Sequence, residues 1–371
     1  MTNPGKIFML RPRSTFAYGQ DFLDALMSAQ PGFQSLPKVN GIYSIDMVEN
    51  AHVVVGQNPD DEEESRALSQ LAKTERTAVF LHCQWEYFDD RQKENAMRAL
   101  KGATIGMTPA RFLTERMQRQ FSGVRWKTVD GCVDERQFFP STEAERSLFR
   151  RDMGLAEGHK VVLFAGRLEP AKGTQILRDL CASTRRKFAI LIQYPAWQEI
   201  REKKRLFKIY EDTCAELSAF PHVYFYPDQD PRSPPRPARL VDAFVSPSLS
   251  EVQPLVLLEA LASGIPFVGT DSTPDYAELR RRFRDSAILS SAIETIDLPD
   301  DLKRGAFPRW PKKRDLASQP IANALVEAIN RKPIPDDRSR AAVSSEFLAR
   351  GFTVQDRILK FREALEDPSL H

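Results

Sequence analysis

Short apolar runs alternate with segments of helical spacing along most of this chain, and this alternation limits the folds open to it. The runs fall at residues 6–10, 51–56, 77–82, 102–108 and 126–129 in the first half and at 160–165, 187–192, 223–226, 243–245 and 266–269 in the second. Continuous apolar runs of this length are typical of parallel strands buried on both faces. Repeated strand–helix units in each half predict an α/β protein of two doubly wound, Rossmann-like domains that face each other across a cleft.

A turn followed by a polar helix separates the two series of strands. A length of 371 residues suits two domains better than one. We therefore place an N-terminal domain at residues 1–150 and a C-terminal domain at residues 151–345.

Composition excludes several classes of function. A formal net charge of +2 gives no electrostatic basis for nucleic-acid binding. The cysteines are widely spaced and form no Cys-x-x-Cys pair, so we expect reduced thiols and no structural zinc. No segment has the pattern of a signal peptide or the length of a membrane span, which leads us to expect a cytoplasmic protein.

The segment 246–266 carries two acidic residues, Glu251 and Glu259, around the predicted start of a helix. Pro254 suits the first helical position, because its φ is preset and its missing N–H would have no partner there. Amides at a helix start point outwards with the helix dipole behind them, so they favour an anion such as phosphate. We expect this anion to be held by the residues around the helix start, namely Val252, Gln253, Pro254, Leu255 and Val256.

Two cations follow the first strand of the second half. Gly166 and Arg167 come directly after residues 160–165, and Lys172 follows five positions after the arginine. Ligands of α/β folds bind at the carboxyl ends of strands. A guanidinium holds phosphate through paired hydrogen bonds and an ammonium adds a compact charge, so both cations are candidates for a diphosphate site.

These motifs together resemble the retaining glycosyltransferases of the GT-B fold, family 4 type. The resemblance rests on Gly-Arg-Leu-Glu-Pro-Ala-Lys-Gly at 166–173 and on Glu251-x7-Glu259 followed by Gly264-x-Pro266. It implies that Arg167 and Lys172 hold the diphosphate of a nucleotide-sugar donor. It also implies that Glu251 contacts the sugar hydroxyls and Glu259 the ribose.

Weaker similarities extend over the rest of the chain. Residues 130–140 resemble the turn between the domains of this family, and residues 346–371 include a helix similar to the one that crosses back to the first domain. His82 stands at a strand end where the family often has a histidine near the donor sugar. A structural role for His82 is an equally open alternative.

Two segments depart from the family pattern. The usual Gly-Gly loop after the first strand is absent, and Arg11, Arg13 and Gly19 lie there instead. We expect these residues to bind the donor, with Arg11 or Arg13 reaching the diphosphate; the alternative is that either arginine is simply solvated. The proline-dense segment 227–237 replaces the region that in relatives helps to hold the base, so the resemblance leaves UDP and GDP sugars open.

Other patterns have alternative readings. Asp228-Gln-Asp230 matches a metal-binding Asp-x-Asp motif, but prolines flank it and favour a turn, so we predict no metal site. The basic helix within residues 110–127 could contact anionic lipid at the cytoplasmic face of a membrane, or could be an ordinary packed surface helix.

The sequence therefore predicts a metal-independent, cofactor-free transfer of a hexose-type sugar from a UDP- or GDP-sugar to a hydroxyl group, with retention of configuration. The acceptor is a glycan, a lipid-linked molecule or a small molecule. The alternatives are an epimerase or phosphorylase of the same fold, and a degenerate protein that binds a nucleotide sugar without turning it over.

Overall fold

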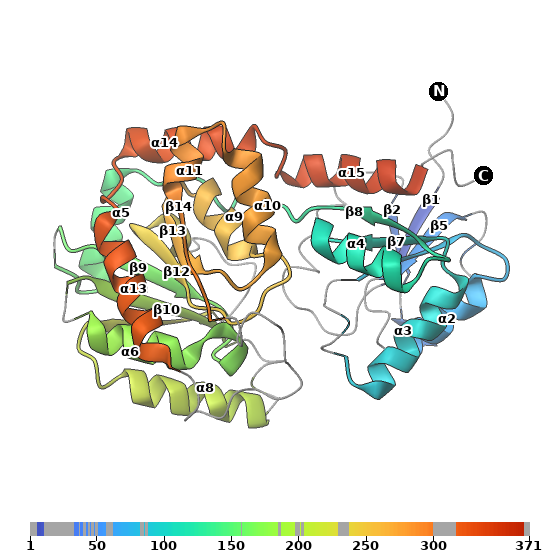
Figure 1. Cartoon of the computed structure of the whole chain (residues 1–371), viewed down its shortest axis with the longest axis horizontal. Coiled ribbons are helices and arrows are strands. Elements are labelled where there is room, and N and C mark those ends of the chain that lie inside the picture. The colour runs from blue at the N-terminus through green and yellow to red at the C-terminus, as the bar shows by residue number, and fades with distance from the viewer. Residues whose placement is uncertain are drawn as a thin grey trace. The chain divides into compact units, whose positions relative to one another are not determined.

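The chain divides into two units. The computed structural model assigns Met1–Cys132 and Val354–His371 to unit 1, and Val133–Thr353 to unit 2. The structure describes residues 6–10, 33–36, 38–39, 42–43, 45, 48, 51–56, 62–81, 85, 88–156, 158–184, 187–196, 201, 204–228, 237–299 and 317–366. Each unit is built on its own parallel sheet (Figure 1).

The sheet of unit 1 has the strand order β2-β1-β5-β6-β7-β8, and its neighbours are parallel throughout. Its strands are β1 (Lys6–Leu10), β2 (Phe33–Leu36), β5 (Ala51–Gly56), β6 (Thr77–Phe80), β7 (Ile105–Thr108) and β8 (Arg125–Thr128). A short antiparallel pair, β3 (Lys38–Val39) and β4 (Ile42–Tyr43), accompanies it. The helices are α2 (Glu62–Leu71), α3 (Asp90–Gly102), α4 (Arg111–Gln120) and α15 (Val354–Glu366).

The C-terminal helix α15 completes the core of unit 1. Ile358, Phe361 and Leu365 are buried in the cluster that contains the strand side chains. The rings of Phe361 and Phe80 stack with their centroids 6.2 Å apart. Lys360 also pairs with Asp130 at 3.0 Å between Nζ and Oδ2. The predicted return of the last helix to the first domain is therefore confirmed.

The sheet of unit 2 has the strand order β11-β10-β9-β12-β13-β14, and it too is parallel. Its strands are β9 (Val161–Ala165), β10 (Ala189–Pro195), β11 (Val223–Asp228), β12 (Ala243–Ser246), β13 (Phe267–Thr270) and β14 (Ile293–Ile296). The order reverses between β9 and β12, which is the arrangement of a doubly wound dinucleotide-binding fold.

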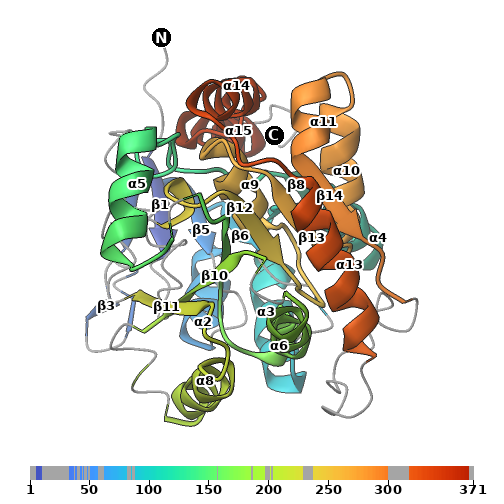
Figure 2. The ribbon, with the colours of Figure 1, turned by 90° about the vertical axis from the view of Figure 1, so that its left-hand side faces the viewer.

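Helices cover both faces of this second sheet. They are α5 (Glu143–Asp152), α6 (Thr174–Ser183), α8 (Lys204–Leu217), α9 (Leu255–Ala262), α10 (Pro274–Phe283), α11 (Ala287–Ala292), α13 (Ser318–Arg331) and α14 (Asp337–Leu348), with 3₁₀ turns η3 (Pro170–Lys172) and η4 (Pro237–Arg239). In Figure 1, α6 and α8 lie below the sheet, and α9, α10 and α11 lie above it. Helix α13 packs beside α6, as Figure 2 shows from the side of unit 2.

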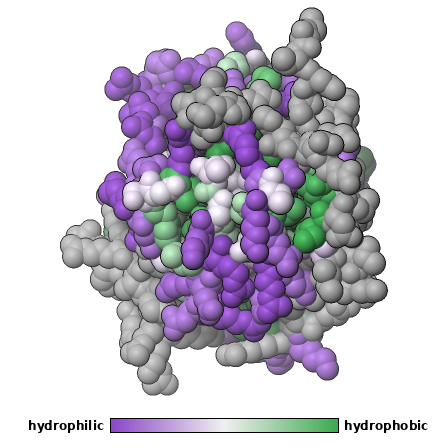
Figure 3. Space-filling model, turned by 90° about the vertical axis from the view of Figure 1, so that its right-hand side faces the viewer, coloured by the Kyte–Doolittle hydropathy of each residue, from purple (hydrophilic) through white to green (hydrophobic). Residues whose placement is uncertain are grey.

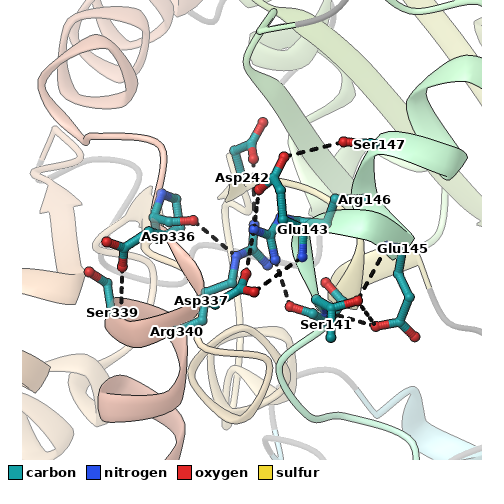
Figure 4. Close-up of polar contacts among 12 residues, drawn as sticks. Ser141, Glu143, Glu145, Arg146, Ser147, Asp242, Asp336, Asp337, Ser339 and Arg340 are labelled. Atoms are coloured by element: carbon teal, nitrogen blue, oxygen red, sulfur yellow. Dashed lines mark hydrogen bonds and ion pairs between the residues drawn. The ribbon is translucent and has the colours of Figure 1, made fainter.

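A buried ionic cluster of Arg146, Arg150, Arg340 and Asp242 ties α5 and α14 to the start of β12. Figure 4 shows Arg146, Arg340 and Asp242 in this cluster. Asp242 has no solvent-exposed surface, and Arg150 Nη2 lies 2.7 Å from each of its carboxylate oxygens. Arg340 Nη2 lies 3.4 Å from Asp242 Oδ1, and burial lowers the pKa of this guanidinium to about 10. Buried charges persist only when such partners surround them.

This ionic cluster places α5 in unit 2. Arg146 on α5 donates to Asp337 on α14 over 2.7 Å. The first unit accordingly ends at Cys132, whereas we drew the boundary after residue 150. At the start of unit 2, Val133 forms a parallel bridge with Thr353, where the chain leaves the unit again.

Helix α14 also fixes the carboxyl end of α9. The Ser344 hydroxyl donates to the carbonyl of Ala262 over 2.7 Å. Gly264 follows α9 with φ of +72°, and a Cβ there would lie 2.3 Å from the carbonyl oxygen of Arg340. Only glycine fits both the left-handed backbone and this close approach. The Gly264-x-Pro266 motif thus holds α9, whose other end faces the candidate site.

Candidate functional site

The candidate site lies where the strand order of unit 2 reverses. Strands β9 and β12 are neighbours in the sheet, with Leu163 opposite Phe244. Both run in the same direction, so the loops that follow them, 166–173 and 247–254, emerge at the same edge. In open α/β sheets, ligands bind at this reversal point, outside the carboxyl ends of the strands.

The first loop carries the two predicted cations. The amide of Gly166 donates to the carbonyl of Gln193 over 3.1 Å, which holds the start of the loop against β10. Arg167 then pairs with Glu169, with 2.9 Å between Nη2 and Oε1. The loop closes in the 3₁₀ turn η3, which ends on Lys172.

The two loops are fixed against each other through their backbones. The amide of Leu249 donates to the carbonyl of Ala171 over 2.9 Å. Gly173 has φ of +71°, and a Cβ there would lie only 1.9 Å from the carbonyl oxygen of Pro247. The position of Lys172 relative to the second loop is therefore set by backbone contacts on both sides of it.

Lys172 and Glu251 meet across the two loops. The Lys172 Nζ atom lies 2.7 Å from Oε1 and 2.9 Å from Oε2 of Glu251. Their side chains are 22% and 11% exposed, so this pair is shielded from most of the solvent. The fold thus brings two of the predicted site residues into direct contact, a pairing that the sequence did not predict.

Helix α9 begins one residue later than we expected. Pro254 is the residue before the helix, with φ of −78° and ψ of 84°, and Leu255 is the first helical residue. The amide of Leu255 donates to the carbonyl of Gln253, and the carbonyl of Val252 accepts from the Thr273 hydroxyl over 3.1 Å. Gln253 and Pro254, just before the helix, are buried. The predicted donor-binding residues around them are partly exposed, namely Val252, Leu255, Val256 and Glu259.

Two buried tyrosines lie beside the acidic residues of the site and were not part of the sequence prediction. Burial, with the negative charge of Glu251 nearby, raises the pKa of Tyr276 well above its ordinary value. Burial and the charge of Glu169 likewise raise the pKa of Tyr210, on α8. Both hydroxyls are therefore neutral at physiological pH. Glu169 was visible in the sequence, two residues after Arg167, but its pairing depends on the folded loop.

Several predicted residues cannot be placed. Arg11, Arg13, Gly19 and His82 lie outside the described residues. Asp228 ends β11, while the rest of the Asp-x-Asp motif also lies outside them. Within the described part of the chain, no group of three or more possible ligands is arranged to hold a metal ion.

The basic helix predicted within residues 110–127 is α4, a packed surface helix. Its apolar residues Leu113 and Met117 are buried in unit 1, and Arg111 pairs with Glu115 at 2.9 Å. On the face of unit 1 shown in Figure 3, hydrophobic residues form small patches between hydrophilic ones. No helix among the described residues is long and apolar enough to cross a membrane.

Residues 145–289 match the family model described as "Glycosyl transferases group 1". This range contains Arg167, Lys172, Glu251 and Glu259. The chain is also similar to D-inositol 3-phosphate glycosyltransferases, with 30% identity over 166 residues for that of Nocardia farcinica and 30% over 155 residues for that of Salinispora arenicola. These matches involve 43% and 39% of this chain. They span 35% and 34% of the length of the relatives, about a third.

Solved structures resemble the chain over almost its whole length. Anabaena Alr3699/HepE, in complex with UDP, has a TM-score of 0.70 at 15% identity, covering 98% of this chain and 100% of the other. Sucrose-phosphate synthase from Thermosynechococcus elongatus has a TM-score of 0.66 at 13% identity, covering 98% of both chains. These structures confirm the predicted GT-B fold. The match of residues 145–289 to the family model agrees with the resemblance drawn from the motifs of the second half.

Proposed function

We propose that this GT-B protein, whose residues 145–289 match the group 1 glycosyl transferases, transfers a hexose-type sugar from a nucleoside-diphosphate sugar to a hydroxyl group with retention of configuration. The observation that carries the proposal is the meeting of Lys172 and Glu251, with Arg167 in the same loop, at the point where the strand order reverses. The cation suits the negatively charged diphosphate of such a donor, and the carboxylate suits the hydroxyl groups of its sugar.

The cations supply the main catalytic contribution in this proposal. Negative charge grows on the diphosphate as the bond to the sugar breaks. Once the donor is bound, cations held beside the diphosphate stabilise the transition state without further rearrangement. Arg167 and Lys172 take this role, so the transfer needs no metal and no cofactor beyond the nucleotide sugar itself. Glu251 accepts hydrogen bonds from sugar hydroxyls, and Glu259 from the ribose.

We propose UDP as the nucleotide of the donor. The support is structural similarity to proteins whose structures contain UDP and UDP-glucose, among them Anabaena Alr3699/HepE. The acceptor stays a hydroxyl-bearing glycan, lipid-linked molecule or small molecule. A cytoplasmic location and a peripheral membrane contact remain predictions from the sequence.

A nucleotide panel followed by a turnover assay tests the proposal. UDP, GDP, ADP and their glucose conjugates are added in a thermal-shift experiment, where a ligand that binds the folded state raises the melting temperature. Release of nucleoside diphosphate from the selected sugar nucleotide is then measured with and without acceptor hydroxyls. We expect a UDP-sugar to stabilise the protein, and we expect Lys172→Ala to abolish turnover while its circular dichroism stays unchanged.

Lys208→Ala is the matched control, because Lys208 is 67% exposed and pairs with Asp212, one turn further along α8. It should retain full turnover. Stabilisation by none of the nucleotides would refute the donor site. Turnover that requires inorganic phosphate, or that needs no acceptor, would favour a phosphorylase or an epimerase, and binding without turnover would favour a degenerate protein.

A further inference from the structure

Each cation of the candidate site is neutralised by a carboxylate of the same chain. Arg167 pairs with Glu169, and Lys172 pairs with both oxygens of Glu251. The four side chains therefore carry no net charge when both pairs are formed. A diphosphate that binds here has to compete with these carboxylates for the cations.

The two pairs differ in how they are held. Glu169 follows Arg167 by two residues in one loop, so the pair can move with the loop. Glu251 belongs to the other loop and is the less exposed acid of the two, at 11% against 19% for Glu169. When a phosphate draws the ammonium away, the carboxylate of Glu251 loses a close counter-charge at a place that is shielded from most of the solvent. Removing the cation from a shielded ion pair is unfavourable for the remaining charge.

A sugar-loaded donor can compensate for this loss, whereas a free nucleoside diphosphate cannot. The hydroxyls of the sugar donate hydrogen bonds to Glu251 at the moment when the phosphate takes Lys172, and hydrogen bonds to a charged acceptor are the strong ones. The spent nucleotide offers phosphate oxygens to Lys172 but no donor to Glu251.

We propose that the Lys172–Glu251 pair selects the loaded donor over the spent nucleotide, which makes Glu251 a specificity-determining residue. This inference rests on the proposed function, since it assumes a nucleotide sugar in this site. Because the free nucleoside diphosphate breaks the Lys172–Glu251 pair without offering Glu251 a new hydrogen-bond donor, it binds less tightly. Its release after transfer is thereby favoured. Glu169 has no such role, because its neutralisation should affect both ligands through the diphosphate that they share.

Isothermal titration calorimetry with UDP and UDP-glucose tests the proposal on the full chain; if the nucleotide panel selects another base, the corresponding pair is used. The variants are Glu251→Gln and Glu169→Gln, which remove the same charge and keep the side-chain shape. We expect wild-type protein to bind UDP-glucose more tightly than UDP. In Glu251→Gln, the Kd for UDP should fall about tenfold, equivalent to about 1.4 kcal/mol, while the Kd for UDP-glucose should not fall. In Glu169→Gln, the two Kd values should change by the same factor.

Other outcomes separate the inference from the function on which it rests. Equal tightening of both ligands by Glu251→Gln would show a general charge effect and overturn the selection. Tighter binding of UDP than of UDP-glucose by the wild-type protein would overturn it as well, without recourse to any variant. In both cases the protein would still bind a nucleotide sugar. Failure of the wild type to bind any of the nucleotides would instead refute the proposed function.

Discussion

Replacing Gly173 by alanine should displace the loop that carries Lys172. The residue combines two features that exclude a side chain: φ of +71°, and a position where a Cβ would lie 1.9 Å from the carbonyl oxygen of Pro247. That oxygen belongs to the backbone of the loop following β12. The clash therefore cannot be relieved by rotating a side chain, and one of the two loops has to move.

The loss of stability in Gly173→Ala has two contributions, one from the left-handed backbone and one from the close contact with Pro247. An alanine in the left-handed region costs about 1–2 kcal/mol. Forcing an extra carbon into a packed position, with the backbone shifts that follow, costs about 1–3 kcal/mol more. We therefore expect the free energy of unfolding of Gly173→Ala to fall by about 2–5 kcal/mol, provided that the loop stays in place. If the loop moves instead, the stability loss will be smaller and the binding of the nucleotide sugar will weaken.

The variant Gly158→Ala measures the contribution of the left-handed backbone alone. Gly158 has φ of +73°, but no atom lies within 4 Å of the place where its Cβ would be. Urea unfolding followed by circular dichroism should show a loss of only about 1–2 kcal/mol for this variant, and binding of UDP-glucose should be unchanged. Equal stability and equal binding for Gly173→Ala and Gly158→Ala would refute the role of the close contact with Pro247.

Two further predictions concern buried groups of unit 2. Asp242→Asn leaves Arg150 and Arg340 without their buried counter-charge and should cost about 3–5 kcal/mol in urea unfolding, whereas Glu143→Gln, at an acid that is 65% exposed, should cost less than about 1 kcal/mol. Burial raises the pKa of the Cys181 thiol from 9.0 to about 12, so the folded state holds this proton more tightly than the unfolded state. Its contribution to stability is complete below pH 9.0 and is lost as the pH rises towards 12. The decline of the unfolding free energy over this range should be shallower in Cys181→Ala, and an equally steep decline would contradict the assignment.

The sequence predicted most strands because most of them are short, largely apolar runs. Val53, Val54 and Val55 in β5 are fully buried, as parallel strands covered on both faces require. Two strands of the described parallel sheets were missed, as was the short antiparallel pair β3–β4. The two missed strands, Phe33–Leu36 and Ile293–Ile296, mix polar with apolar residues. Edge positions explain this, since β2 and β14 end their sheets and bury less of their surface in strand pairs.

The domain boundary could not be drawn from local pattern. The helix Glu143–Asp152 is polar and amphipathic, and nothing in its own sequence assigns it to either half. Its place is decided by Arg146 and Arg150, whose partners Asp337 and Asp242 lie 191 and 92 residues further along the chain. Pairing over such distances depends on which elements pack together.

For the site, the sequence by itself determined the chemistry. It placed Arg167, Lys172 and Glu251 in the loops that follow two strands, and Glu259 in the helix after the second loop. Loops after parallel strands emerge at one edge of a sheet, where ligands bind. Only the tertiary structure decided that β9 and β12 are neighbours, and therefore that Lys172 meets Glu251, 79 residues away. The sequence determines which side chains follow each strand. The order of the strands is set by the packing of the whole sheet. Because this order makes β9 and β12 neighbours, Lys172 and Glu251 form an ion pair.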